Sequence, residues 1–416
     1  MEQVLLCGDQ NPYHATSTEY NVCQGGADWR VTVWVQGGLI STDGIIKYMR
    51  VKLALAPGAG KEVDLTFMLN GAPTALTFKI EDAATFNSNM VNEIDVTGGD
   101  RVSLRLNPDV VPTVGELTWS FMFEGDNPGE SIILGNSQDN HMAQGGVTYG
   151  SVMGSDFLDN VEAWHRQLCP TAGTFKNIYC LMLGSPGAPP DAYKFSLADG
   201  GTATALAVTF VAPAEGGSNL VDTFDADPYD RLTLRIDPVD TPTADNASMW
   251  GFTFVSDVDG ESIVMGGTGL GGDLHPTNTE YVSLAKDEVL DPRDEDEKWQ
   301  LSQACTVSKL HVRLTASIAG GTSYTFTVRI AAANSNVVAV IDGTSLGDSG
   351  GLSDAVALDN YLALQIVPAN TPDIVNAYWG AVLYLEPPPL EGGGAGAVVM
   401  GTKSLILDLL LEGVID

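Results

Sequence analysis

The sequence predicts an all-β protein built from tandem antiparallel β-sandwiches. Its periodic segments are short and alternate between apolar and polar residues, as in Val102-Ser103-Leu104-Arg105-Leu106. Such alternation is typical of strands with one buried and one solvated face. Turn residues follow these segments directly, as at Asn70-Gly71 and Asp199-Gly200-Gly201, which is where tight hairpins need them. No segment reads as a convincing helix of more than two turns, and residues 405–412 fit a helix or a strand equally well.

A short apolar strand that ends in glycine recurs along the chain, with a spacing of roughly 130 residues, which indicates internal repeats. Its copies are Val4-Leu5-Leu6-Cys7-Gly8, Ile132-Ile133-Leu134-Gly135, Ile263-Val264-Met265-Gly266 and Val398-Val399-Met400-Gly401. We expect this strand to end each sandwich and lead into the next one, so that 398–400 is the last strand of the third.

Other landmarks keep the same order within each copy. An early tryptophan occurs at Trp29, Trp164 and Trp299. A strand that begins Asp-Arg or Asn-Tyr and ends in proline occupies 100–108, 230–238 and 360–368. A second tryptophan strand follows at Trp119, Trp250 and Trp379.

These landmarks predict three sandwiches, at 1–135, 136–266 and 267–401, and an apolar C-terminal tail at 402–416. About 130 residues and about eight strands fit either a jelly-roll or an immunoglobulin-like sandwich. Size and strand count favour the jelly-roll, and the sequence leaves the connectivity open.

The charge excludes two classes of partner. The chain has 53 acidic and 20 basic side chains and a formal charge of −33, so it lacks the basic face that nucleic acid or an anionic membrane would bind. No apolar run approaches the roughly 20 residues of a membrane-spanning helix. The N-terminus does not resemble a signal peptide, so we expect folding in the cytosol. We interpret the 5 cysteines as small buried hydrophobes rather than a disulfide framework or zinc site.

Few residues suggest chemistry, and no catalytic motif is present. We expect Trp119, Trp250 and Trp379 to be core residues rather than sugar-stacking platforms. Arg101 and Arg231, at strand entrances, predict solvated ends or local ion pairs. His14, Glu19 and Tyr20 recur as His275, Glu280 and Tyr281 and are expected to pin the turn between domains. The sequence therefore predicts no catalytic residue and no cofactor.

Calcium is the one metal that the sequence allows. The weak candidate ligands are Asp257, Asp259 and Glu261, although this turn lacks a full calcium-binding loop. The acidic stretch 291–297 predicts a solvated loop.

The apolar centre of the tail suggests assembly. Its residues are Ile406, Leu407, Leu409, Leu410 and Leu411. They could cover the tail's own sandwich or contact another subunit. Trp34 has no counterpart in the other copies and could mark a contact surface.

The repeated unit resembles a β-sandwich module of bacteriophage and other virus structural proteins. The matching pattern is Asp-Arg-x-(Ser/Thr)-Leu-x-(Leu/Ile)-x-Pro, a Thr-Pro turn and Trp-x-Phe-x-Phe, at 100–123 and 230–254. The third copy departs from it, with Asn360-Tyr361 in place of Asp-Arg. The resemblance implies a capsid decoration, spike or fibre component, commonly trimeric, with other virion proteins as partners. It supplies no functional residues.

The leading hypothesis is therefore a non-enzymatic structural protein on the surface of a virion, made in the host cytoplasm. The alternatives are a carbohydrate- or receptor-binding adhesive module, whose partner would be a host-surface glycan, and a subunit of an extracellular filament. An exposed aromatic face would favour the glycan-binding alternative.

Overall fold

The structure is a computed structural model. It describes residues 1–9, 11–32, 36–138, 140–155, 157–243, 247–269, 272–285, 290, 299–300 and 302–385. The chain divides into two compact units, Met1–Glu386 and Pro387–Asp416, and the described residues all belong to the first.

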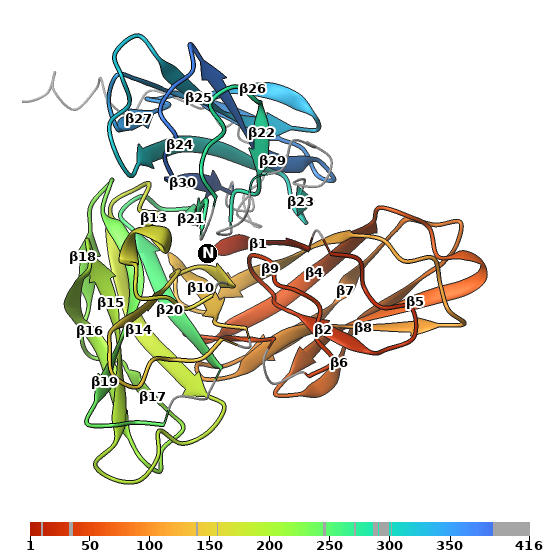
Figure 1. Ribbon diagram of the computed structural model, residues 1–416. Coiled ribbons are helices and arrows are strands. Elements are labelled where there is room, and N and C mark those ends of the chain that lie inside the picture. Colours follow the sequence, from red (N-terminus) through yellow and green to blue (C-terminus); the bar gives the residue numbers. More distant parts are fainter. Residues whose placement is uncertain are drawn as a thin grey trace, which may run out of the picture. The chain divides into compact units, whose positions relative to one another are not determined.

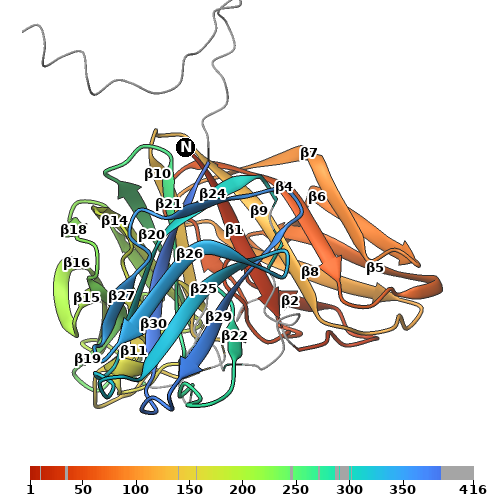
Figure 2. The same ribbon diagram turned by 90° about the horizontal axis from the view of Figure 1, so that it is seen from above.

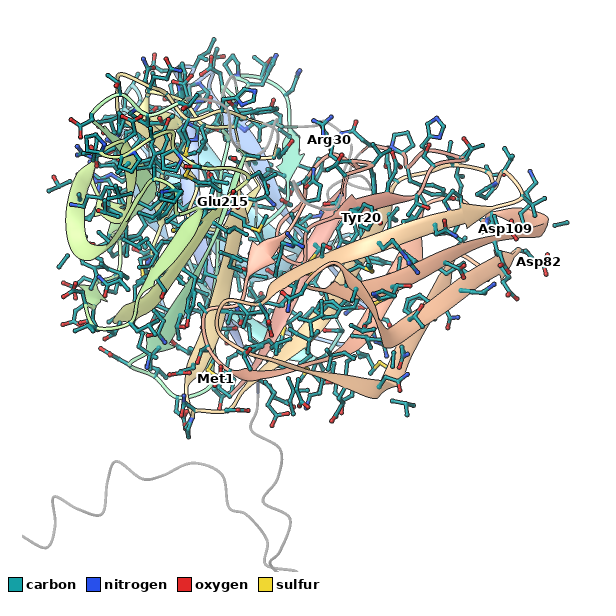
Figure 3. The ribbon with its side chains drawn as sticks, turned by 90° about the horizontal axis from the view of Figure 1, so that it is seen from below. Met1, Tyr20, Arg30, Asp82, Asp109 and Glu215 are labelled. Atoms are coloured by element: carbon teal, nitrogen blue, oxygen red, sulfur yellow. The ribbon has the colours of Figure 1, made fainter. Side chains whose placement is uncertain are left out.

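The first sandwich consists of two facing sheets, ordered β1-β9-β4-β7 and β2-β8-β5-β6, with the short β3 also paired to β8 (Figure 1). Its strands are β1 (Glu2–Asp9), β2 (Glu19–Asn21), β3 (Gly38–Leu39), β4 (Gly44–Leu53), β5 (Gly58–Leu69), β6 (Ala72–Asp82), β7 (Phe86–Val96), β8 (Arg101–Asp109) and β9 (Leu117–Gly125). Figure 3 shows Asp82 and Asp109 at the end of this sandwich far from Met1.

The second sandwich repeats this order as β10-β20-β14-β17 and β11-β19-β15-β16. Its main strands are β10 (Glu130–Asn136), β11 (Thr148–Gly150), β13 (Gln167–Leu168), β14 (Gly173–Met182), β15 (Ala192–Asp199), β16 (Thr202–Val211), β17 (Gly216–Asn219), β18 (Phe224–Ala226), β19 (Arg231–Val239) and β20 (Ser248–Ser256). It adds β12 (Gly154–Ser155), which pairs in parallel with β10, and the 3-10 helix η1 (Glu162–Trp164).

The third sandwich has the orders β21-β30-β24-β27 and β22-β29-β25-β26. Its strands are β21 (Glu261–Gly267), β22 (Glu280–Val282), β23 (Trp299–Gln300), β24 (Cys305–Leu314), β25 (Ser323–Ile330), β26 (Ala333–Asp342), β27 (Leu346–Asp348), β28 (Ser353–Val356), β29 (Tyr361–Ala369) and β30 (Ala377–Tyr384). The all-β antiparallel prediction is confirmed.

The pairing is that of a jelly-roll. In the first sandwich β1 pairs with β9, β2 with β8, β4 with β7 and β5 with β6. The chain is thus a long hairpin rolled into two sheets, and the other two sandwiches follow the same scheme.

The predicted boundaries need correction, because the shared apolar strand opens each sandwich rather than closing it. Residues 130–136 pair with β20, and 261–267 pair with β30. Divisions after residues 135 and 266 would therefore cut through β10 and β21. The fourth copy, at 398–400, lies outside the described residues.

The second tryptophan of each copy occupies one structural position, and the prediction that it is a core residue is confirmed. Trp119, Trp250 and Trp379 are fully buried. Each indole N–H donates to a backbone carbonyl, of Val22, Val152 and Leu284, at 3.0, 2.9 and 3.1 Å. On the opening strands, the residues paired with these tryptophans are Cys7, Gly135 and Gly266. The sequence alignment that matches Gly8 with Gly135 and Gly266 is therefore offset by one residue.

The early tryptophans are not equivalent, and that alignment was wrong. Trp29 stands immediately before Arg30, which forms a β-bridge with Tyr20. In the second sandwich the equivalent bridge joins Asp159 and Tyr149, so Leu158 occupies the position of Trp29. Trp164 lies on η1, and Trp299 lies in β23 at the position of Gln167. Trp29 packs on Trp119 with ring centroids 5.5 Å apart.

The predicted turns follow β5 and β15. Asn70 and Gly71 have φ of 52° and 79°, and Gly200 and Gly201 have 52° and 80°. Two successive left-handed residues are what the right-handed twist of a tight hairpin requires. Within the described residues, no helix is long and apolar enough to cross a membrane.

Candidate functional site

The strongest repeated feature is the junction between sandwiches, and its centre is the set of opening strands β1, β10 and β21. In β1, Leu5 and Cys7 join the core of the first sandwich, whereas Val4 and Leu6 join the cluster formed by the other two. In β10, Ile133 faces its own core, and Ile132 and Leu134 join that of the first sandwich. Burial on both faces explains why these strands are continuously apolar rather than alternating. Figures 1 and 2 show where β1, β10 and β21 lie in the fold.

Polar side chains also tie these strands together. The amide of Gln3 on β1 donates to the carbonyl of Ile132 and accepts from its N–H, both at 2.8 Å. Gln24 accepts a hydrogen bond from the N–H of Leu134 at 2.6 Å. The part of the β10 edge that β12 does not pair is thereby hydrogen-bonded by the first sandwich.

A close backbone contact recurs beside each junction. A Cβ atom at Gly251 would collide with the carbonyl oxygen of Leu39 on β3, and one at Gly380 would collide with that of Leu168 on β13. Each glycine follows the core tryptophan, so glycine here is required by the approach of a neighbouring sandwich. Ser120 takes this position in the first sandwich, where Ser302 donates to the carbonyl of Phe121 at 3.1 Å.

A glutamate–lysine pair accompanies each opening strand. Glu130 pairs with Lys176 at 2.7 Å and accepts a hydrogen bond from Thr42 of the first sandwich. Glu261 pairs with Lys309 at 2.6 Å and accepts one from Thr171 of the second at 2.8 Å. In the first sandwich the pair is Glu2 and Lys47 at 3.0 Å.

The electrostatics of Glu130 reflect this setting. Burial acts to raise the pKa of its carboxyl group, but hydrogen bonds from Lys176, Thr42 and Asn127 outweigh burial and lower the pKa overall. The carboxylate is therefore held ionised by groups from two sandwiches.

A third contact starts from a β-bulge that recurs in β4, β14 and β24. Tyr48, Asn177 and Lys309 occupy this bulge with φ of 55°, 52° and 50°. The residues that resume the pairing are Arg50, Tyr179 and His311.

Each of these residues contacts the loop that precedes β8, β19 or β29 of another sandwich. Arg50 forms an ion pair with Asp359 of the third. Tyr179 packs against Gly98 and Gly99 of the first. His311 stacks on Tyr229 of the second.

The contacts run in one cyclic direction. Segments β3, β13 and β23 pack on the second, third and first sandwich in turn, against the opening strand and the tryptophan strand of each. Equivalent loops also meet at one place, where a Cβ atom at Gly25 would collide with Gly154 and approach the carbonyl of Ala285. Each sandwich thus contacts both others through equivalent surfaces.

The calcium candidates do not form a cluster. Glu261 is buried and bound to Lys309 and Thr171. The N–H of Asp257 donates to the carbonyl of Ala172, as part of the turn between β20 and β21. Within the part of the chain that the structure describes, no group of three acidic, histidine or cysteine side chains could hold a metal ion.

The histidine loops have a local geometry. Glu19 accepts a hydrogen bond from the N–H of His14 at 2.7 Å, and Glu280 accepts one from His275 at 2.8 Å. Each histidine Nδ1 in turn accepts from the N–H of a nearby threonine, Thr16 or Thr277. The expectation that these residues pin the turn between domains is wrong, because each motif closes a turn between the first two strands of its own sandwich. Tyr20 and Tyr281 pair within the sheet that this turn leads into.

The cysteines are free and buried. Burial raises the pKa of Cys169 and of Cys305 to about 12. The thiols therefore stay protonated and unreactive, and the interpretation as small hydrophobes is confirmed. Arg101 is buried, so it is not a solvated strand end, and burial lowers its pKa. Trp34, the stretch 291–297 and the five tail residues 406, 407 and 409–411 lie outside the described residues.

The junction residues were not predicted from the sequence. Available signals were the Trp-Gly pairs at 250–251 and 379–380 and the Gly-Glu-Ser triplets at 129–131 and 260–262. No protein-family model matches the chain, and the comparison with curated proteins finds no relative.

Proposed function

We propose that the chain is a non-enzymatic structural protein, a rigid three-sandwich element on the surface of a virion. The observation that carries the proposal is the cyclic set of junctions, in which β1, β10 and β21 are buried between sandwiches. Three bodies that each contact the other two have little freedom to hinge, unlike a linear string with single contacts. Such rigidity suits a decoration, spike or fibre component.

The placement of the repeated residues supports a structural role. The tryptophans are in the cores, and the glutamates and glycines are in the junctions. The residues that the three copies share are thus accounted for by packing. The resemblance to virion sandwich modules and the acidic, cysteine-poor composition fit a protein that folds in the host cytoplasm and later works outside it.

The glycan-binding alternative has less support. Its main argument was that the recurring tryptophans could present exposed rings, and Trp119, Trp250 and Trp379 are fully buried.

The proposal is tested on particles. Virus particles purified from the source of the sequence should label with gold-conjugated antibody against the full chain, and their digest should contain its peptides. Particles disrupted with detergent serve as the control for internal proteins. Particles that carry neither the label nor the peptides would show that the chain is not a virion component.

A further inference from the structure

We infer that the junction is a head-to-tail docking site whose partner is a sandwich of the same kind, including one supplied by a second copy of this chain. The inference concerns assembly and does not depend on the proposed virion role.

Each sandwich carries both halves of the interface at different places. One half is the segment around β3 or β13, with Leu39 and Thr42 or Leu168 and Thr171. The other half is formed by the opening strand, the tryptophan strand and the lysine of the bulged strand. An interface between two different patches is head-to-tail, and it closes into a ring when the rotation between units fits.

The two halves match chemically at successive junctions. Thr42 donates to Glu130 as Thr171 donates to Glu261. The carbonyl of Leu39 lies over Gly251 as that of Leu168 lies over Gly380. In the third junction Ser120 takes the position of Gly251 and Gly380, and Ser302, which aligns with Ser41, donates to the carbonyl of Phe121, so the same docking geometry tolerates different side chains.

The covalent links contribute little to these contacts. Only 126–129 and 257–260 separate β9 from β10 and β20 from β21. The turns bond locally, as where the N–H of Glu130 donates to the carbonyl of Asn127. Each link therefore raises the effective concentration of the next sandwich rather than forming the interface, so a sandwich from another chain can take its place.

The experiment uses the full chain with a short protease recognition sequence inserted into each of these two turns. The protein is purified intact and then cut under native conditions, and its mass is measured by light scattering. We expect the three pieces to stay together at the mass of the uncut chain. A tagged and an untagged sample, cut and then incubated together, should form complexes that contain pieces of both.

Gly251→Ala in the same cut protein is the matched test of the interface. Its added methyl group meets the Leu39 carbonyl, so we expect about tenfold weaker retention of the first piece. Gly146→Ala in the same piece is the control, because its added methyl group meets no atom within 4 Å, and it should retain the first piece. The inference is overturned if the cut pieces part without any substitution, folded or not, or if hybrid complexes never form. It is also overturned if Gly251→Ala and Gly146→Ala behave alike.

Discussion

The ring of Tyr229 lies flat on the imidazole of His311, with centroids 4.2 Å apart and planes inclined by 6°. The tyrosine hydroxyl donates to Asp348 at 2.9 Å. The pair joins the second and third sandwiches. At the equivalent positions, the Arg50–Asp359 ion pair joins the first and third sandwiches, and Tyr179 packed on Gly98 and Gly99 joins the first and second.

Acid should weaken this junction. Burial lowers the pKa of His311 below its ordinary value of 6.5; Asp348 and the backbone of Cys169 act to raise it, and Lys309 acts to lower it. The unfolded chain therefore takes up the proton first as the pH falls, so the stabilisation is complete above pH 6.5 and is lost below it. Urea unfolding between pH 7.5 and about 5 should show a steeper loss for the wild type than for His311→Phe, which keeps a stacked ring. Parallel curves for the two proteins would contradict the role of His311.

Alanine at the junction glycines should destabilise the protein. Gly251→Ala and Gly380→Ala place a methyl group against a neighbouring backbone carbonyl, and overpacking of this kind costs about 1–3 kcal/mol. The free energy of unfolding from urea titrations measures the loss. Ser120→Ala is the control, because its site already holds a side chain, and it should change stability by less. Equal losses at the three sites would point to sheet propensity rather than to the junction.

The buried glutamate and its lysine should depend on each other. Glu130→Gln leaves Lys176 and Thr42 without their carboxylate partner, which we expect to cost about 1–3 kcal/mol. Lys176→Met should cost a similar amount, and the double variant should lose less than the two single losses combined. Denaturant titration of the four proteins gives the coupling free energy. Strict additivity would mean that the ion pair contributes nothing.

The third hairpin should be improvable. Ala331 and Ala332 occupy its turn with φ of 49° and 65°, where the first two sandwiches have Asn70-Gly71 and Gly200-Gly201. Left-handed backbone costs alanine about 1 kcal/mol relative to glycine, so Ala332→Gly should raise the free energy of unfolding by about that amount. The reverse change, Gly201→Ala, is the matched control and should lower it. A neutral Ala332→Gly would show that the turn is not strained.

The strands and the core tryptophans could be predicted because local alternation and turn residues encode them. In 102–106 the apolar side chains of Val102, Leu104 and Leu106 all lie in the core, as their alternating positions predict. The opening strand could not be assigned in this way, because burial on both faces removes the alternation that would show which sandwich it joins. The burial of Arg101 could not be predicted for a related reason: its side chain packs against the segment around Gly37, which is distant in sequence.

The difference among Arg50, Tyr179 and His311 has a consequence for fidelity. Three identical subunits would have to use one residue at this position, and any order of assembly would be equivalent. In a single chain the position holds a cation, a phenol and an imidazole, each matched to a different loop. A sandwich that docks in the wrong place therefore meets a mismatched partner. The side chains at this position thus help to determine which sandwich docks against which.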